Sequence, residues 1–231
     1  MKTYPGGKGT SFRHLINLMP KHDTYIETHL GGGAVMRNKK PAKRNIGIDI
    51  DSSVIQKWSE ESHTDLNIEL LCMDAACFLQ TYSFSGNELV YCDPPYLAET
   101  RRGSKIYRYE YTIAEHQQLL QLINTLPCQV MISGYDHPLY RDILAAWHSY
   151  SFSAVTRQGK AVETVWFNYP PPGQLHDGRY WGKDFREREK IRRRTDNLKR
   201  KISSLSQHER TSIINWMHEQ YGNAVDNYDN W

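Results

Sequence analysis

The sequence contains few cysteines and no long apolar run. Its four cysteines form no C-x-x-C pair, which predicts buried thiols in a reducing compartment rather than a disulfide framework or a zinc site. No stretch approaches the ~18 apolar residues of a membrane span, and the start of the chain lacks the apolar core of a signal peptide. These absences favour a cytoplasmic protein, of a bacterium or a phage-infected host, without a membrane partner or a bound metal.

Charge is distributed unevenly along the chain. Eleven of the 29 Lys/Arg residues and four of the 26 Asp/Glu residues lie between Arg179 and Lys201, which leaves 18 basic and 22 acidic residues elsewhere. A strongly basic segment beside a mildly acidic body suggests a polyanionic partner, most often nucleic acid. A solvated charged helix is the alternative interpretation of the same segment.

Short β-branched runs alternate with helical patterns as far as about residue 150. Strands are predicted at 25–27, 46–50, 66–73, 89–92 and 129–133, and a hairpin of two further strands near 150–156 and 161–169. Ser52 or Ser53 is expected to cap one helix, Thr112 and Glu115 form a capping box for another, and a third is predicted over 138–147. The alternation predicts an α/β fold with a doubly wound, mostly parallel sheet and an antiparallel edge hairpin.

The proline run at 170–172 marks a domain boundary. We expect a first domain over 1–172 and a basic helical extension over 173–231. Within the extension, Ser206 and Glu209 form a second capping box, and Gly222 is placed to end the last helix. A narrow apolar stripe either packs on the rest of the chain or pairs with a second copy as a homodimer; its residues are Ile191, Thr195, Leu198, Ile202 and Leu205.

Glycines and acidic residues follow three of the predicted strands. Gly31, Gly32 and Gly33 stand between a strand and a helix, where a ligand can approach the backbone closely. Asp49 and Asp74 end the next two strands, and each alone reads most simply as a helix N-cap. Because ligands bind at the carboxyl ends of parallel strands, the joint pattern predicts a ligand cleft. The loop is not G-x-G-x-x-G, so a nicotinamide dinucleotide is disfavoured.

The strongest signal is Asp93-Pro94-Pro95-Tyr96, directly after the fourth strand. Two prolines fix the backbone and have no N–H, so their carbonyl oxygens stand as acceptors without competing donors. A carboxylate beside such a carbonyl can accept both hydrogens of an exocyclic amine. Tyr96 offers a flat face on which a base can stack, an interaction of about 1–3 kcal/mol. Together these groups suit chemistry on the amine of a nucleobase.

These motifs, over roughly residues 1–170, resemble the Dam class of N6-adenine DNA methyltransferases. The resemblance implies S-adenosyl-L-methionine as cofactor, and it assigns cofactor contacts to Tyr4, Gly6, Gly7, Lys8, Glu27, Gly31, Gly32, Gly33, Asp49, Asp74 and Asp93. It implies catalytic roles for Asp93, Pro94, Pro95 and Tyr96 on an adenine flipped out of the DNA duplex. No metal and no covalent enzyme intermediate are implied.

One departure from that family concerns target recognition. Only 44 positions separate Asp49 from Asp93, which leaves no room for the usual internal recognition domain. DNA contacts are therefore expected elsewhere, and the target is expected to be short or relaxed. The candidates are basic and aromatic residues after the catalytic motif and in the basic segment: Arg101, Arg102, Lys105, Tyr107, Arg108, Tyr109, Arg192, Arg193 and Arg194.

Three other functions fit the same residues. N4-cytosine methylation uses the same exocyclic-amine chemistry, and RNA can also present an extruded base. A non-catalytic nucleic-acid-binding protein with a vestigial cofactor site is the alternative from a different class. The intact Lys8 and Asp93-to-Tyr96 motif argue against that last interpretation.

Overall fold

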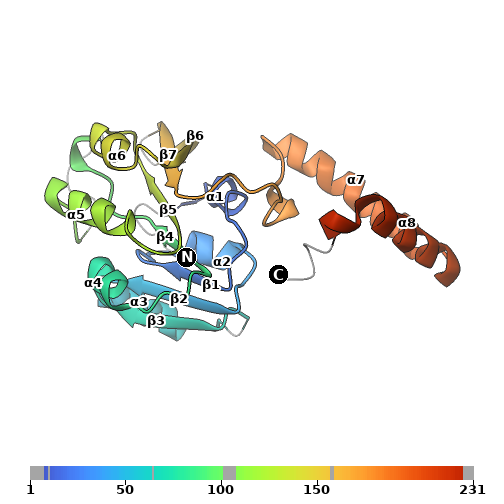
Figure 1. Cartoon of the computed structure of the whole chain (residues 1–231), viewed down its shortest axis with the longest axis horizontal. Coiled ribbons are helices and arrows are strands. Elements are labelled where there is room, and N and C mark those ends of the chain that lie inside the picture. Colours follow the sequence, from blue (N-terminus) through green and yellow to red (C-terminus); the bar gives the residue numbers. More distant parts are fainter. Residues whose placement is uncertain (1–7, 10, 64, 101–107, 157–158, 226–231) are drawn as a thin grey trace. The chain divides into compact units, whose positions relative to one another are not determined.

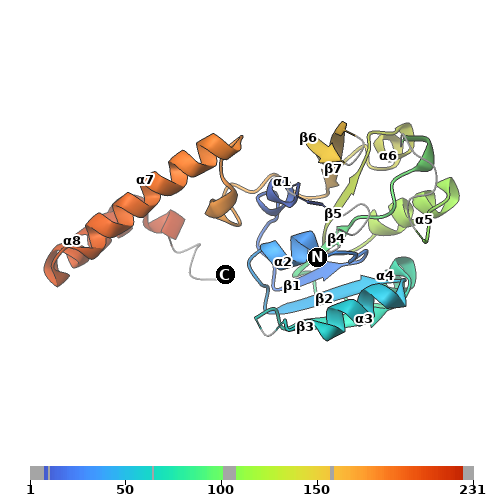
Figure 2. The same cartoon turned by 180° about the vertical axis from the view of Figure 1, so that it is seen from behind.

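The fold is described from a computed structural model at residues 8–9, 11–63, 65–100, 108–156 and 159–225 (Figures 1 and 2). The chain forms two compact units, Met1–His176 and Asp177–Trp231. The first unit holds the sheet with its flanking helices, and the second holds two long helices. Each unit is described by itself below.

The first unit is built on a seven-stranded sheet in the order β3-β2-β1-β4-β5-β7-β6. Its strands are β1 (Thr24–Glu27), β2 (Arg44–Asp49), β3 (Ile68–Cys72), β4 (Glu88–Cys92), β5 (Gln129–Gly134), β6 (His148–Thr156) and β7 (Gly159–Phe167). Strand β1 pairs in parallel with β2 and β4, and the next pairs outward, β2 with β3 and β4 with β5, are also parallel. Strand β7 runs antiparallel to both β5 and β6. The predicted fold class, a doubly wound and mostly parallel sheet with an antiparallel edge hairpin, is confirmed.

The strand order reverses at β1, which pairs with β2 on one side and β4 on the other. In open α/β sheets, such a reversal separates the loops that leave the carboxyl ends and opens a crevice between them. The loop after β1, the end of β2 and the loop after β4 therefore meet at one edge. These three segments hold the glycine loop, Asp49 and Asp93.

The helices of this unit are α1 (Phe12–Ile16), α2 (Ala34–Asn38), α3 (Ser52–Glu60), α4 (Ala75–Thr81), α5 (Ile113–Ile123) and α6 (Pro138–Ile143), with a short 3-10 helix η1 (Ala98–Thr100). Figure 1 shows α4, α5 and α6 along one side of the sheet and α1 and α2 on the other. The main core lies under the first group, where Phe78, Leu119 and Tyr140 pack with Ile26 and Val90 of the strands.

Several local predictions are corrected by the structure. The N-cap of α3 is Asp51, whose carboxylate accepts from the Ser53 N–H, because Ser52 and Ser53 are already helical. Helix α6 ends at Ile143 rather than at 147. Helix α4 was not among the predicted elements, although Asp74 alone suggested a helix N-cap; the helix begins at Ala75 and Asp74 caps it. The capping box of Thr112 and Glu115 is confirmed at α5.

The second unit contains η2 (Gly178–Tyr180), α7 (Phe185–Ser203) and α8 (Gln207–Val225). The capping box of Ser206 and Glu209 forms, with both backbone N–H groups bonded to the partner's side chain. Helix α8 does not end at Gly222, because a glycine inside a helix weakens it without forbidding it. Leu198 and Ile202 of the predicted apolar stripe are 54% and 40% exposed. Homodimerisation through this stripe remains a prediction.

The cysteines differ from the expectation that all are buried. Cys92 is buried in β4, but Cys72 and Cys77 are exposed. Cys72 lies on β3, at the edge of the sheet, and Cys77 lies in the short helix α4. Within the described ranges, no helix combines the length and apolar character that crossing a membrane requires.

Candidate active site

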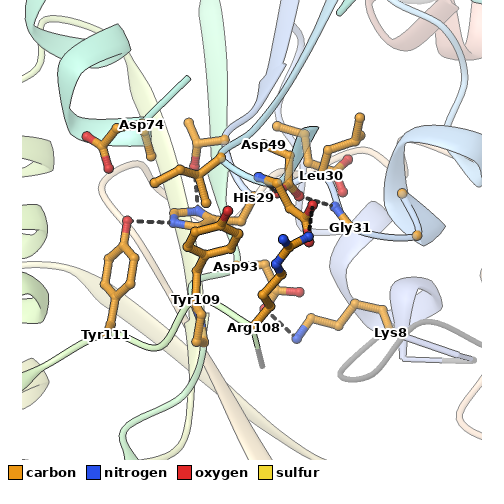
Figure 3. Close-up of a pocket in the computed structure, with 18 of the residues that line it drawn as sticks. Lys8, His29, Leu30, Gly31, Asp49, Asp74, Asp93, Arg108, Tyr109 and Tyr111 are labelled. Carbon is orange, nitrogen blue, oxygen red and sulfur yellow. Dashed lines mark hydrogen bonds and ion pairs between the residues drawn. The ribbon is translucent and has the colours of Figure 1, made fainter. Parts of the chain in front are cut away.

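A pocket opens where the loops after β1, β2, β3 and β4 come together (Figure 3). The space between its walls, counted out into the open solvent at its mouth, is about 810 Å³. The loop that precedes α5 contributes a further wall through Arg108, Tyr109 and Tyr111. The lining includes all eight of the described residues predicted from sequence to contact a cofactor: Lys8, Glu27, Gly31, Gly32, Gly33, Asp49, Asp74 and Asp93.

The pocket is predominantly acidic. Five carboxylates line it, from Glu27, Asp49, Asp51, Asp74 and Asp93, against the two cationic side chains Lys8 and Arg108. A polyanion such as a dinucleotide would meet repulsion from most of these groups. A ligand with a net positive charge and hydroxyl groups suits them, because carboxylates accept hydrogen bonds and neutralise cations.

The glycine loop is supported from beneath by Trp58 of α3. The Trp58 indole N–H donates to the Gly31 carbonyl at 3.0 Å, and Gly33 adopts a left-handed backbone with φ of 58°. A Cβ on Gly33 would lie only 2.0 Å from Trp58 Cζ2. Glycine is therefore required at this position both by backbone conformation and by contact. The glycines were predicted from sequence, whereas the tryptophan that supports them was not.

Asp49 ties this loop to β2. One of its carboxylate oxygens accepts from the Gly31 N–H at 2.8 Å, and the other accepts from the Asp51 N–H at 2.9 Å. Burial raises the pKa of Asp49, and these two donors oppose that shift. Each oxygen keeps further lone-pair capacity toward the pocket. Asp49 is thus a fixed acceptor suited to ligand hydroxyls.

Arg108, from the loop that precedes α5, lies across the pocket from the end of β2. Its guanidinium Nη1 lies 3.4 Å from Oδ1 of Asp51, the residue that caps α3. Tyr109 follows it in the lining. Arg108 and Tyr109 were predicted to contact nucleic acid, whereas the structure brings both to the wall of the predicted cofactor cleft.

Asp74, His29 and Tyr111 form the end of the pocket opposite Lys8 in Figure 3. Asp74 caps α4 by accepting from the Cys77 N–H at 2.9 Å, so it serves both as an N-cap and as a pocket residue. His29 joins Thr28 at 2.9 Å through Nδ1 and Tyr111 at 3.1 Å through Nε2. Burial lowers the pKa of His29 to about 3, so the ring is neutral near pH 7 and orients Tyr111. Neither His29 nor Tyr111 was singled out from sequence.

Glu27 is buried on β1 at the back of the glycine loop. Its Oε2 accepts from the Tyr25 hydroxyl and from the Met36 N–H, both at 3.0 Å. Burial raises the pKa of Glu27 to about 8, and the charge of Asp93 adds to that rise. Lys39 is buried nearby, and burial lowers its pKa to about 7. Glu27 therefore holds a proton over much of the neutral range.

The raised pKa of Glu27 predicts a pH-dependent contribution to stability. A carboxyl group whose pKa is higher in the folded state stabilises fully below its ordinary pKa, near 4.5, and loses this contribution as pH rises through about 8. Glu27→Gln keeps the acceptor but cannot ionise. We therefore expect this variant to gain free energy of unfolding relative to the wild type as pH rises from about 4.5 to 8, measured by urea denaturation across that range.

Glu88→Gln is the matched control, with the opposite sign. Burial alone would raise the pKa of Glu88, but hydrogen bonds from Ser85 and Gly86 outweigh it and lower the pKa. A carboxyl group whose pKa is lowered in the folded state stabilises that state above its ordinary pKa, and this contribution is lost as pH falls. The loss of free energy of unfolding in Glu88→Gln should therefore be largest at neutral pH and shrink in acid. A pH-independent difference between Glu27→Gln and the wild type would contradict the raised pKa of Glu27.

Asp93, at the end of β4, belongs to a buried polar cluster. Lys8 Nζ lies 2.7 Å from Asp93 Oδ1 and 3.5 Å from Glu163 Oε2, and it also donates to the Tyr96 hydroxyl. The Tyr96 hydroxyl donates in turn to Glu163 at 3.3 Å. Burial raises the pKa of Asp93 to about 6; Lys8 opposes this rise and the charge of Glu163 adds to it. Glu163 is a member of this cluster that sequence reasoning missed.

The remaining predicted site residues fall into three groups. Pro95 lines the pocket; Pro94 and Tyr96 are buried beside it, with the Tyr96 ring set edge-on against Tyr135. Arg192, Arg193 and Arg194 are exposed on α7, where Glu189 pairs with the first two. The other predicted residues lie outside the described part of the chain: Tyr4, Gly6, Gly7, Arg101, Arg102, Lys105 and Tyr107.

Comparison with known proteins gives structural likeness only. No protein-family model and no curated protein matches the sequence. Among solved structures, TrmK of M. capricolum in complex with S-adenosyl-homocysteine is 9% identical, with 90% of this chain and 94% of that chain covered and a TM-score of 0.47. The N-methyltransferase NodS from Bradyrhizobium japonicum is 12% identical over 70% and 94%, with a TM-score of 0.47. A dimethyladenosine transferase from Plasmodium falciparum is 14% identical over 71% and 62%, with a TM-score of 0.46.

Proposed function

We propose that this chain is an S-adenosylmethionine-dependent DNA methyltransferase that acts on the exocyclic N6 amine of adenine. One observation carries the proposal: Asp93, the carboxylate of the Asp-Pro-Pro-Tyr motif, lines the same pocket as the glycine loop, Asp49 and Asp74. A group that can hold an amine therefore faces the groups suited to the cofactor. The resemblance of these motifs to the Dam class supports adenine as the acceptor.

The charge of the pocket fits this cofactor. S-adenosylmethionine carries a sulfonium and an ammonium group against one carboxylate. Besides the largely protonated Glu27, four acidic side chains line the pocket against two cationic ones. Asp49 would hold the ribose hydroxyls, and Asp74 with Tyr111 would border the adenine. Glu27 and the glycine loop would bind the methionine portion. When bound, the cofactor supplies a methyl group on positively charged sulfur, the electrophile of the reaction.

The chain's own residues would act by orientation and electrostatics. Asp93 and the Pro94 carbonyl would accept the two hydrogens of the target amine, which directs the nitrogen lone pair toward the cofactor. The negative charge of Asp93 would stabilise the positive charge that develops on that nitrogen. The prolines keep the acceptors rigid, since they fix φ and lack an N–H. No metal and no covalent enzyme intermediate are part of this scheme.

The proposed DNA contacts draw on the basic helix α7. Nine of its nineteen residues are Lys or Arg, and Arg192, Arg193 and Arg194 are exposed. Such side chains contact phosphates and position a protein without reading sequence. The stretch from Asp49 to Asp93 is filled by α3, β3 and α4, so it holds no recognition domain. We therefore propose a short or relaxed target; a recognition site longer than about five base pairs, read by this chain alone, would contradict it.

The direct test supplies labelled S-adenosylmethionine with unmodified DNA and analyses the nucleosides. N6-methyladenine is the expected product. If the label appeared on N4 of cytosine, or on RNA in a parallel reaction, the catalytic scheme would stand and the proposed acceptor, adenine in DNA, would be replaced. Binding of DNA without transfer to any acceptor would favour the non-catalytic protein instead.

Cofactor binding predicts a thermal shift that does not depend on the acceptor. A ligand at about 100 times its Kd stabilises the folded state by about 2.7 kcal/mol. We expect S-adenosylmethionine to raise the Tm of the wild type and to have much less effect on Asp49→Ala, measured by differential scanning fluorimetry. Asp142→Ala, an exposed aspartate on α6, is the control and should retain the shift. An equal shift in Asp49→Ala would remove Asp49 from the cofactor site.

A further inference from the structure

Lys8 occupies the acceptor that the proposed reaction requires. Its ammonium lies 2.7 Å from Asp93 Oδ1, with both side chains largely buried. A target amine would need that carboxylate as its hydrogen-bond acceptor. A carboxylate can accept several donors, so the amine can reach Asp93 while Lys8 is bound, but the ammonium then neutralises the charge that would stabilise the amine nitrogen. A second position for the lysine would restore that charge to the amine.

Glu163 offers that position. Its Oε2 lies 3.5 Å from Lys8 Nζ, and its side chain is only 9% exposed. The Tyr96 hydroxyl, bonded to both residues, links the two ends of the path. A modest displacement of the ammonium, away from Asp93 and toward Glu163, would keep the buried charge paired throughout. An unpaired buried ammonium would be costly, so the alternative carboxylate lowers the barrier to release.

The topology explains why Glu163 reaches this site. Strand β7 runs antiparallel to β5, and Gly134, the last residue of β5, pairs with Thr164. Glu163, the residue before Thr164, therefore lies at the edge where β4 and β5 end. Glu163 is thus beside the carboxyl ends of the parallel strands, although 155 positions separate it from Lys8 in sequence.

We infer that Glu163 is a positioning residue that accepts Lys8 when the target amine takes its place on Asp93. This inference rests on the proposed function. It assigns to the antiparallel edge hairpin a role in substrate binding, because β7 supplies the second carboxylate. The exchange involves hydrogen bonds and an ion pair only, and no covalent bond forms or breaks.

The test compares Glu163→Gln with the wild type in methyl transfer. Glutamine keeps the size and the acceptor for Tyr96 but removes the charge that would receive Lys8. We expect kcat to fall about 10- to 100-fold, as for the loss of one hydrogen bond to a charged group. The Kd for S-adenosylmethionine should be unchanged, since Glu163 does not line the pocket. Glu88→Gln, at the opposite end of β4, is the control and should retain kcat.

A pH profile separates this role from a merely structural one. Without the charge of Glu163, Lys8 remains on Asp93 and the pKa of Asp93 falls, so the acidic limb of kcat should move to lower pH. The other titratable groups that act on or respond to Asp93 are Tyr25, Glu27, Tyr91, Cys92, Tyr96 and Tyr140. Of these, Tyr91 also responds to the charge of Glu163, and Tyr96 is hydrogen-bonded to it.

A double-mutant cycle with Lys8→Met tests whether Glu163 acts through Lys8. We expect the effect of Glu163→Gln to shrink toward onefold in that background. The inference would be overturned, with the proposed function intact, if Glu163→Gln left kcat and its acidic limb unchanged. It would also be overturned if Glu163→Gln lowered kcat by the same factor with Lys8 present and with Lys8→Met. A wild type that methylates no nucleic acid would refute the proposed function and the inference with it.

Discussion

Asp93→Ala is expected to lower methyl transfer to DNA by about a thousandfold, the size of effect seen when one preorganised electrostatic group is removed from an active site. The variant loses the carboxylate that would accept the amine hydrogens and stabilise the charge on the attacking nitrogen. It also removes the 2.7 Å ion pair that holds Lys8. Initial rates at saturating S-adenosylmethionine, with nucleoside analysis of the product, measure this loss.

Two further variants serve as controls for Asp93→Ala. Asp142→Ala removes an exposed aspartate of α6 and should keep wild-type rates. Asp93→Asn keeps the shape of the side chain but not its charge, so it should remain far less active than the wild type. If Asp93→Ala retained more than about a tenth of the wild-type rate, Asp93 would not be the amine acceptor.

Gly33→Ala is expected to lower the free energy of unfolding by about 2–5 kcal/mol. A non-glycine residue in the left-handed region costs about 1–2 kcal/mol, and forcing a methyl group into a packed site costs about 1–3 kcal/mol. Both apply here, since φ is 58° and the new Cβ would lie 2.0 Å from Trp58 Cζ2. Urea denaturation followed by circular dichroism gives the difference.

The control for Gly33 is another glycine with space around it. A Cβ on Gly173 would meet no atom within 4 Å, so Gly173→Ala should leave the unfolding transition unchanged. Gly33→Ala should also weaken S-adenosylmethionine binding, because the loop can relieve the clash only by moving away from Trp58. Wild-type stability in Gly33→Ala would show that the loop tolerates another backbone conformation.

Local patterns were enough to predict where along the chain each of the seven strands lies. Hydrophobic period and residue type identified all seven. The two capping boxes are present because a Ser or Thr and a Glu three residues later each accept a hydrogen bond from the other's backbone N–H. Short helices were less predictable. Helix α4 has only seven residues and little periodicity, so only its packing of Phe78 and Leu79 into the core distinguishes it from a loop.

The sequence by itself determined the chemistry that this chain can offer: an Asp-Pro-Pro-Tyr turn, a glycine loop and acidic residues at strand ends. Their meeting in one pocket was also predictable, because parallel strands bring their carboxyl ends to one edge. Only the tertiary structure decided which other side chains join them. Trp58 beneath the glycines, Tyr111 on His29 and Glu163 beside Lys8 carry no motif. Each is brought to the site by packing or strand pairing between segments far apart in sequence, which local pattern does not encode.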